Sequence, residues 1–446
     1  GRSRTTSQAA GVRRPGRMSV GRAARPARTD ARRSVRSLRN SNFRLFLVGQ
    51  SVSQTGMWMQ QTAELWLILQ LTGRGSALAL HSVLRFGPVL LFGAYAGVFS
   101  DRFDRRRLLI ITQTVLALAA ATVAITSWLA SPNLALIYGV VTVQGLVNAV
   151  DNPLRRGFVR DLLPDEDLTN GVSLNSGAMT LSRTAGPALG GVVIASFGVV
   201  PCFALNALSF VAVLATLFRI DSAALRSSEP VARAAGQLRE GFRYAWQRPE
   251  IRTALLMIAV AGAFVWNWAT VLPVYASTTL EGGASLYGML LAVLSIGAFA
   301  GAVATTRLVR VERRHLLTAS GLMAAALLLA ALARPLPVVV VALVTLGAAS
   351  TAFAIGCQAR IQLATDNAVS GRVLALYSVG FVGSKPLGGL IAGWVIDAAG
   401  PRVAFGLNAA VVAAMTLTAL VAGQRVRRRH ALTPARTHSA RGRPAR

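Results

Sequence analysis

A short basic turn in the first quarter of the chain reads Gly97-Val-Phe-Ser-Asp101-Arg102-Phe-Asp104-Arg105-Arg106-Arg107. It joins two long apolar stretches, residues 77–99 and 107–130. A helix needs about 20 apolar residues to cross the hydrocarbon core of a bilayer, and each stretch is long enough. The pattern therefore predicts two antiparallel membrane helices with a charged turn at one membrane surface.

The same pattern repeats along the whole chain. Of its 446 residues 53% are hydrophobic and only 14% are charged, a balance that is too apolar for an ordinary soluble domain. Hydropathy predicts twelve spans, at 44–71, 77–99, 107–130, 134–152, 171–197, 199–219, 252–279, 286–309, 316–333, 337–357, 373–397 and 401–422. The spans divide six and six around a polar stretch.

This division predicts an all-α integral membrane fold of two pseudo-symmetric six-helix bundles, residues 43–219 and 252–422. Residues 220–251 are too charged to cross a membrane, and we expect them to form a cytoplasmic linker. Residues 1–42 lack the apolar core of a cleavable signal and predict a disordered basic arm, while 423–446 form a basic tail. Both are expected in the cytoplasm.

The predicted orientation follows from the arginines, because basic links stay on the cytoplasmic side of a membrane. They gather after the second, fourth and eighth spans, at Arg102, Arg105, Arg106, Arg107, Arg155, Arg156, Arg160, Arg307, Arg310, Arg313 and Arg314. Both termini are therefore expected inside the cell, with the protein in the bacterial inner membrane. The net charge of +30 lies between apolar spans, so the expected partners are the lipid bilayer and a small-molecule substrate, not nucleic acid.

The two halves also share short sequence motifs. Residues 187–190 (Pro-Ala-Leu-Gly) are echoed at 386–389 (Pro-Leu-Gly-Gly), in the fifth and eleventh spans. Residues 203–207 (Phe-Ala-Leu-Asn-Ala) recur at 405–409 as Phe-Gly-Leu-Asn-Ala. Repeats of this kind place a substrate site between the halves, near the middle of the membrane.

The turn at residues 97–107 resembles the signature of the major facilitator superfamily, and the resemblance extends from about residue 40 to 422. In that family the turn is a conformational latch, a role that the resemblance gives to Gly97, Asp101, Arg102, Arg105 and Arg106. Asp104 stands where the family often has Gly. The alternative for the arginines alone is simple retention of positive charge on the cytoplasmic side.

Two further resemblances point to the exporter branch. Gly186-Pro187-Ala-Leu-Gly190-Gly191 resembles the Gly-Pro motif of antiporters in this superfamily; the alternative is ordinary tight helix packing. Residues 148–155 and 58–61 are similar to those of siderophore exporters and macrolide efflux permeases. The resemblance implies efflux of a drug, siderophore or other metabolite. Val141 stands where many proton-coupled antiporters have Arg, which weakens the case for proton coupling.

Four ionisable side chains lie inside the apolar spans: Glu64, Arg85, Arg183 and Lys385. A charge at the centre of a membrane helix costs at least about 2.5 kcal/mol unless it faces a cavity or a partner. Glu64 and Arg85 both lie about 11 Å deep at 1.5 Å per residue. We expect them to pair across neighbouring helices, with His81 on the same face as Arg85.

Arg183 and Lys385 lie near the middle of their spans, and Lys385 is the only lysine in the chain. This indicates a need for an ammonium group, which a guanidinium does not replace. The alternative is an amine that donates to a backbone carbonyl near Pro386. If these cations and Arg85 share one cavity, Glu64 balances only one of them, and the remaining positive potential favours an anionic or electron-rich cargo.

Three more residues are candidates for the substrate and coupling cavity. Trp266 and Asn267 are expected to line it, with Trp268 pointing elsewhere by helical spacing; the alternative is a belt of aromatics at the membrane interface. Glu64 is the first candidate for a proton carrier. Asp151, at the cytoplasmic end of the fourth span, is the second.

The sequence predicts no enzymatic activity, no metal and no cofactor. It contains no G-x-x-x-x-G-K-[ST] motif and no catalytic cluster, and its two cysteines, Cys202 and Cys357, fall in apolar stretches. We therefore expect a secondary active transporter that works by alternating access and is driven by an ion gradient, most simply of protons. An importer of the same fold and a non-transporting membrane sensor or scaffold are the alternatives.

Overall fold

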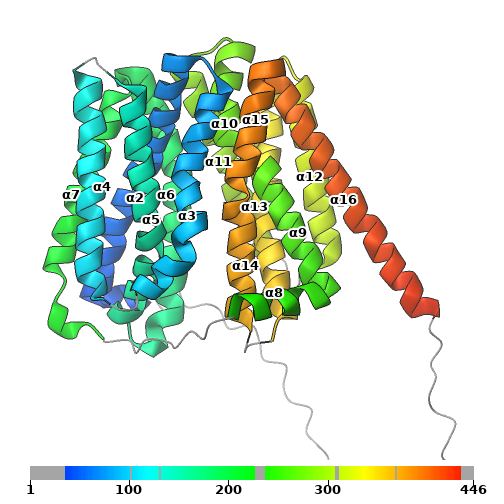
Figure 1. Ribbon diagram of the computed structural model, residues 1–446, viewed down its shortest axis with the longest axis horizontal. Coiled ribbons are helices and arrows are strands. Elements are labelled where there is room, and N and C mark those ends of the chain that lie inside the picture. The colour runs from blue at the N-terminus through cyan, green and yellow to red at the C-terminus, as the bar shows by residue number, and fades with distance from the viewer. Residues whose placement is uncertain are drawn as a thin grey trace, which may run out of the picture.

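The computed structural model describes residues 36–100, 103–129, 132–226, 237–306, 311–366 and 369–432. The elements in these ranges are helices, arranged as two bundles that stand side by side (Figure 1). The first bundle comprises α2 (Ser41–Thr72), α3 (Gly75–Ser100), α4 (Arg105–Trp128), α5 (Leu134–Leu162), α6 (Asp165–Phe197) and α7 (Val200–Arg219). The second comprises α9 (Pro249–Phe264), α10 (Trp268–Val274), α11 (Ala284–Thr306), α12 (Arg313–Leu332), α13 (Leu336–Ala364), α14 (Ser370–Gly383), α15 (Lys385–Ala399) and α16 (Pro401–Leu432).

Ten helical segments in the described part are long and apolar enough to cross a membrane, so the chain is a multi-pass membrane protein. Two of them are composite: residues 249–279 join α9, α10 and a π-helical turn at Tyr275–Thr279, and residues 370–399 join α14 and α15. Helices α2 and α6, with 32 and 33 residues, are long enough to cross a membrane, but they are less apolar than the ten segments and are not among them. They carry Glu64 and Arg183, two of the four predicted intramembrane charges.

Local chemistry sets several helix ends. The Asn40 side chain accepts a hydrogen bond from the Phe43 amide (3.0 Å), and Asp104 accepts one from the Arg107 amide (3.1 Å). Each satisfies a backbone donor that the first helical turn leaves free. Gly73 ends α2 in the left-handed region (φ 64°), where glycine is favoured. Asp104, which departs from the family pattern, is therefore the cap of α4.

Two breaks interrupt the second bundle near its middle. Residues 265–267 separate α9 from α10, and Ser384 separates α14 from α15. Pro386 follows the second break, and its ring removes the amide that a continuous helix would use. These breaks set the positions of Trp266 and Lys385, which lie on or beside them.

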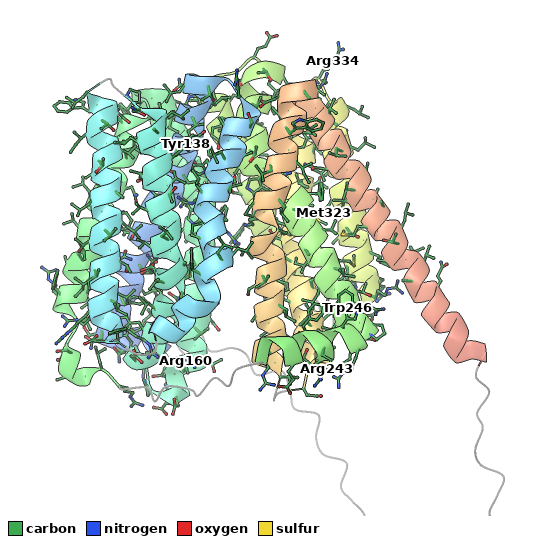
Figure 2. The ribbon with its side chains drawn as sticks, viewed as in Figure 1. Tyr138, Arg160, Arg243, Trp246, Met323 and Arg334 are labelled. Atoms are coloured by element: carbon green, nitrogen blue, oxygen red, sulfur yellow. The ribbon has the colours of Figure 1, made fainter. Side chains whose placement is uncertain are left out.

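Both ends of the molecule can be recognised in Figure 2. Arg160 and Arg243 mark one end, called here the basic end, and Arg334 marks the opposite end. Helix α8 (Gln237–Gln247) lies across the base of the second bundle at the basic end (Figures 1 and 2). It falls within the stretch predicted as a linker, and an ion pair between Glu240 and Arg372 on α14 (2.6 Å) attaches it.

Residues 36–42, expected in the disordered arm, are instead structured. A 3-10 turn (Arg36–Arg39) precedes α2, and the Arg36 guanidinium lies 2.8 Å from Asp167 in the acidic first turn of α6. The Ser37 hydroxyl donates to Asn170 Oδ1 (2.7 Å). At the other terminus, α16 continues to Leu432, whereas the tail was expected to begin at residue 423.

The internal repeat seen in the sequence is also a repeat of contacts. Asn206 on α7 donates to Gln60 Oε1 on α2 (2.5 Å), and Asn408 on α16 donates to Asn267 Oδ1 beside α10 (3.2 Å). The two echoed asparagines thus attach the last helix of each bundle to the first. The motifs at 203–207 and 405–409 therefore occupy equivalent places in the two bundles.

Candidate functional site

The bundles are joined at the opposite end by a carboxylate on α15. Asp397 Oδ1 accepts from the Gly75 amide (2.6 Å) and Oδ2 accepts from the Ser76 amide (3.0 Å), both in the first turn of α3. These amides have no partner within α3, and the positive end of the helix dipole favours a negative charge there. One side chain of the second bundle therefore caps a helix of the first.

Close backbone packing joins the bundles near the same end. A Cβ added to Gly191 on α6 would lie 2.0 Å from the Cα of Gly288 on α11, so only glycine fits there. The rings of Trp66 and Tyr287 stack across the bundles with centroids 5.7 Å apart. By contrast, the ion pairs between described residues near the basic end each connect elements of one half, as Arg105 with Asp161 (2.7 Å) does. The bundles are thus bridged at the opposite end.

A fully buried carboxylate forms the centre of a polar network inside the first bundle. Glu64 Oε1 accepts from Gln60 Nε2 (2.7 Å) and Gln144 Nε2 (3.0 Å). Its Oε2 lies 3.0 Å from His81 Nε2 and 3.7 Å from Arg85 Nη1. The predicted pairing of Glu64 with Arg85 and His81 is therefore present, and it connects α2, α3 and α5.

The network continues through uncharged amides that sequence reasoning did not place in it. Arg85 Nη1 donates to Gln144 Oε1 (2.5 Å), and Gln60 accepts from Asn206. All of these side chains are buried, so any change in the charge of Glu64 must be met by rearrangement of its partners. Histidine is the partner best suited to exchange a proton with it.

Asp151 lies elsewhere in the first bundle. It forms an ion pair with Arg155 one turn along α5, and it accepts from Thr112 Oγ1 and Gln113 Nε2 on α4, each at 2.8 Å. The structure therefore places Asp151 between α5 and α4 and does not bring it together with Glu64. Its carboxylate is buried and multiply bound, as expected of a structural ion pair.

Arg183 on α6 and Lys385 on α15 lie at similar depths in the two bundles. Each lies 14 residues from the end of its helix, Phe197 or Ala399, which is about 21 Å at 1.5 Å per residue. Arg183 is exposed and Lys385 is half-buried. In the part of the chain that the structure describes, neither donates a hydrogen bond, so the alternative of a carbonyl partner for Lys385 is not observed.

Aromatic rings surround the Lys385 ammonium. Its nitrogen lies 5.3 Å from the ring centroid of Phe86 on α3 and 4.9 Å from that of Phe381 on α14, both within cation–π range. Phe381 contacts the Trp266 ring edge to face (centroids 4.8 Å apart) and stacks on Tyr377 (6.1 Å). We call Lys385 and these four rings the central site.

The break after α9 changes where its aromatics point. The rings of Trp266 and Trp268 have centroids 6.1 Å apart, so the prediction that Trp268 points elsewhere by helical spacing is wrong. It assumed a continuous helix, which residues 265–267 interrupt. Asn267 is buried, and its Oδ1 accepts a hydrogen bond from Asn408.

Of the residues assigned to the latch, Arg105 and Arg106 lie at the basic end. Asp101 and Arg102 fall outside the described residues, and Gly97 is placed only as part of α3. Arg105 pairs with Asp161 on α5, and Arg106 donates to the carbonyls of Leu217 (2.9 Å) and Phe218 (3.2 Å) at the end of α7. These two arginines attach the turn to its own bundle.

The Gly-Pro motif of α6 contacts two neighbouring helices, α2 of its own bundle and α11 of the other. A Cβ on Gly186 would lie 2.6 Å from Trp58 Cβ, and one on Gly190 would lie 3.2 Å from Met59, so both glycines let α6 approach α2 closely. Gly191 faces α11 of the other bundle instead. Pro187 is buried within α6.

Comparisons with known proteins agree on one kind of molecule. Residues 33–441 match the family described as transmembrane secretion effector. The staphyloferrin A transporter of Staphylococcus aureus is 28% identical over 61% of this chain; the chain spans 66% of the length of that protein. The multidrug efflux pump Tap of Mycolicibacterium fortuitum is 29% identical over 76% of this chain and 85% of its own. The crystal structure of the nucleoside transporter NupG superposes with a TM-score of 0.66 at 12% identity, covering 85% of this chain and 98% of that one.

Proposed function

Because this chain belongs to the transmembrane secretion effector family of major facilitator transporters, which are not enzymes, we propose that it is a secondary active exporter of a small organic molecule. Its twelve expected spans would rock as two bundles about the central site. The observation that carries the proposal is the bridge at the opposite end, made by Asp397 and Gly191.

The conformation supports an exporter in its loading state. Under the positive-inside rule the basic end faces the cytoplasm. The bundles are then bridged on the outer side, whereas the ion pairs described on the inner side each join elements of one half. Cargo would enter from the cytoplasm, and the outer bridge would open to release it. A relative named as a multidrug efflux pump supports this direction.

An ion gradient supplies the energy in this proposal. The only lysine is Lys385, and Ser384 precedes it, so the chain contains no P-loop for a nucleotide. We assign proton coupling to Glu64, since protonation would remove the charge that His81 and Arg85 surround. Arg85 would then lose its counter-charge, which would loosen the contacts among α2, α3 and α5. Asp151, held by Arg155 and by α4, is the less suitable carrier.

Everted membrane vesicles test the direction of transport. The panel is a set of fluorescent dyes, macrolides and catecholate siderophores, each offered to vesicles with an imposed pH gradient. We expect uptake of at least one class, because everted vesicles present the cytoplasmic side outward. Uptake only in right-side-out vesicles would replace the exporter with an importer. No uptake in either orientation, with the protein shown to be in the membrane, would favour a sensor or scaffold.

A further inference from the structure

Helix α8 presents two large apolar side chains that its own bundle does not cover. Gly241 and Ala245 are buried, and a Cβ on Gly241 would lie 2.8 Å from Cβ of Arg372, so this side of α8 lies against the start of α14. Phe242 and Trp246 are 51% and 47% exposed, and their rings stack with centroids 5.2 Å apart. The two rings therefore form one apolar surface that is open to the surroundings of the protein.

This surface lies at the level where the chain enters the membrane. With 11 residues α8 is about 16 Å long, too short to cross a bilayer core of about 30 Å. The membrane-spanning segment Pro249–Thr279 begins two residues after α8 ends, and α8 lies across the base of the bundle (Figure 1). Figure 2 places Trp246 nearer the middle of the molecule than Arg243. The ring thus lies on the hydrocarbon side of the headgroup layer, and Arg243 lies on its water side.

Two arginines beside the rings lack an acidic partner among the described residues. Arg243 is exposed. Arg252 is half-buried, donates to the Trp246 carbonyl (3.4 Å) and places its guanidinium carbon 5.7 Å from the Trp246 ring centroid. The acids nearby are each bound to another arginine, in the pairs Glu240–Arg372 (2.6 Å), Glu250–Arg360 (3.7 Å) and Asp366–Arg248 (3.1 Å). A positive charge next to an apolar surface therefore remains for a partner from outside the chain.

We propose that Phe242, Trp246, Arg243 and Arg252, called here the α8 surface, bind an anionic phospholipid of the membrane leaflet at the basic end. The rings pack against the glycerol backbone and the upper acyl chains, as aromatic side chains do at membrane interfaces, and the guanidinium groups bind the phosphate. A zwitterionic lipid offers the same apolar groups and a phosphate, but its own ammonium offsets the charge. The charge of the two arginines therefore favours the anionic lipid.

A lipid bound there would hold the second bundle by its base. Helix α8 is attached to α14 by the ion pair of Glu240 with Arg372, and to the end of α13 by Arg248, whose Nη1 donates to the Ala364 carbonyl (3.1 Å). The lipid contact would thereby fix the base of this bundle relative to the membrane surface. It requires neither cargo nor an ion gradient, so it stands or fails independently of export.

Fluorescence quenching measures the local enrichment of anionic lipid around α8. Gln247, exposed at the end of α8, is replaced by cysteine in the full-length protein and labelled with nitrobenzoxadiazole; the natural Cys202 and Cys357 are buried. The labelled protein is placed in phosphatidylcholine nanodiscs that contain either spin-labelled phosphatidylglycerol or spin-labelled phosphatidylcholine as quencher. One basic side chain near an anionic surface changes lipid binding about fivefold. We therefore expect phosphatidylglycerol to reach half quenching at a mole fraction about 25-fold below that of phosphatidylcholine, and about fivefold below it in Arg243→Gln or Arg252→Gln.

Arg160→Gln is the matched control, because it removes an exposed arginine at the same end of the first bundle and should keep the full preference. Equal quenching by the two lipids in the labelled protein without further substitution would overturn the proposal. The full preference retained by the double variant Arg243→Gln/Arg252→Gln would overturn it too, since other basic residues would then attract the lipid. A label that neither lipid quenches would show that something other than lipid covers the α8 surface, which would also overturn it.

Discussion

Asp397→Ala should weaken the bridge between the bundles without touching the central site. The substitution removes both hydrogen bonds to the first turn of α3, at 2.6 and 3.0 Å. Asp397 is exposed, so the loss should be close to that of a typical N-cap, about 1 kcal/mol. The ratio of bridged to open states at the opposite end would then fall about fivefold. Asp397→Asn, which keeps one oxygen acceptor, should give a ratio of bridged to open states between those of Asp397→Ala and the wild type.

Distances between spin labels measure this ratio. Arg74 and Arg334 are exposed at the opposite end, one on each bundle, and can be replaced by labelled cysteines. The natural Cys202 and Cys357 are buried, which limits background labelling. We expect a second, longer distance to gain population in Asp397→Ala. Glu281→Gln, an exposed acid elsewhere in the second bundle, is the matched control and should leave the distribution unchanged. An identical distribution in Asp397→Ala and wild type would refute the assignment of Asp397 to the bridge.

Three further predictions concern other parts of the molecule. Gly191→Val should force the bundles apart, because even a Cβ would lie 2.0 Å from the facing Cα of Gly288. The distance between the spin labels at positions 74 and 334 should therefore increase. An unchanged distance would contradict the contact. Asp151→Ala should leave its buried arginine partner uncompensated and destabilise the protein by about 3–5 kcal/mol in detergent unfolding, whereas a coupling role alone would leave stability intact. At the basic end, the Tyr244 hydroxyl and then the Arg248 guanidinium hold the pKa of Asp366 below its usual 3.8. The contact of Asp366 with Tyr244 and Arg248 should therefore persist above about pH 4 and be lost as the pH falls through the lowered pKa. The rate of proteolysis next to α8 would report this loss. Asp366→Asn should remove the pH dependence.

Much of the architecture follows from hydropathy and charge. Ten of the expected spans coincide with apolar helices because length and composition alone determine whether a helix can cross a bilayer. Intramembrane charges are equally conspicuous, so Glu64, Arg85, Arg183 and Lys385 could be singled out one by one. A charged side chain is energetically unfavourable in lipid, so each one can be singled out as a candidate functional residue without any periodic pattern.

Uncharged polar groups and helix breaks gave weaker signals. Gln60 and Gln144 complete the shell around Glu64, yet an amide inside a membrane helix is common and its partner depends on which helices pack together. The error at Trp268 came from assuming a continuous helix through residues 265–267. Helix α8 was missed because its stretch reads as a charged linker, and its contacts with the second bundle are tertiary.

Proton coupling through Glu64 is the claim most directly open to measurement. Wild-type protein and Glu64→Gln would be reconstituted in liposomes with a transported member of the panel, and uptake would be followed with and without a pH gradient, alongside exchange of cargo at equal pH. We predict that the wild type concentrates cargo against its gradient only when the pH gradient is present. Glu64→Gln should exchange cargo but fail to concentrate it. Gradient-driven accumulation by Glu64→Gln equal to that of the wild type would contradict the account.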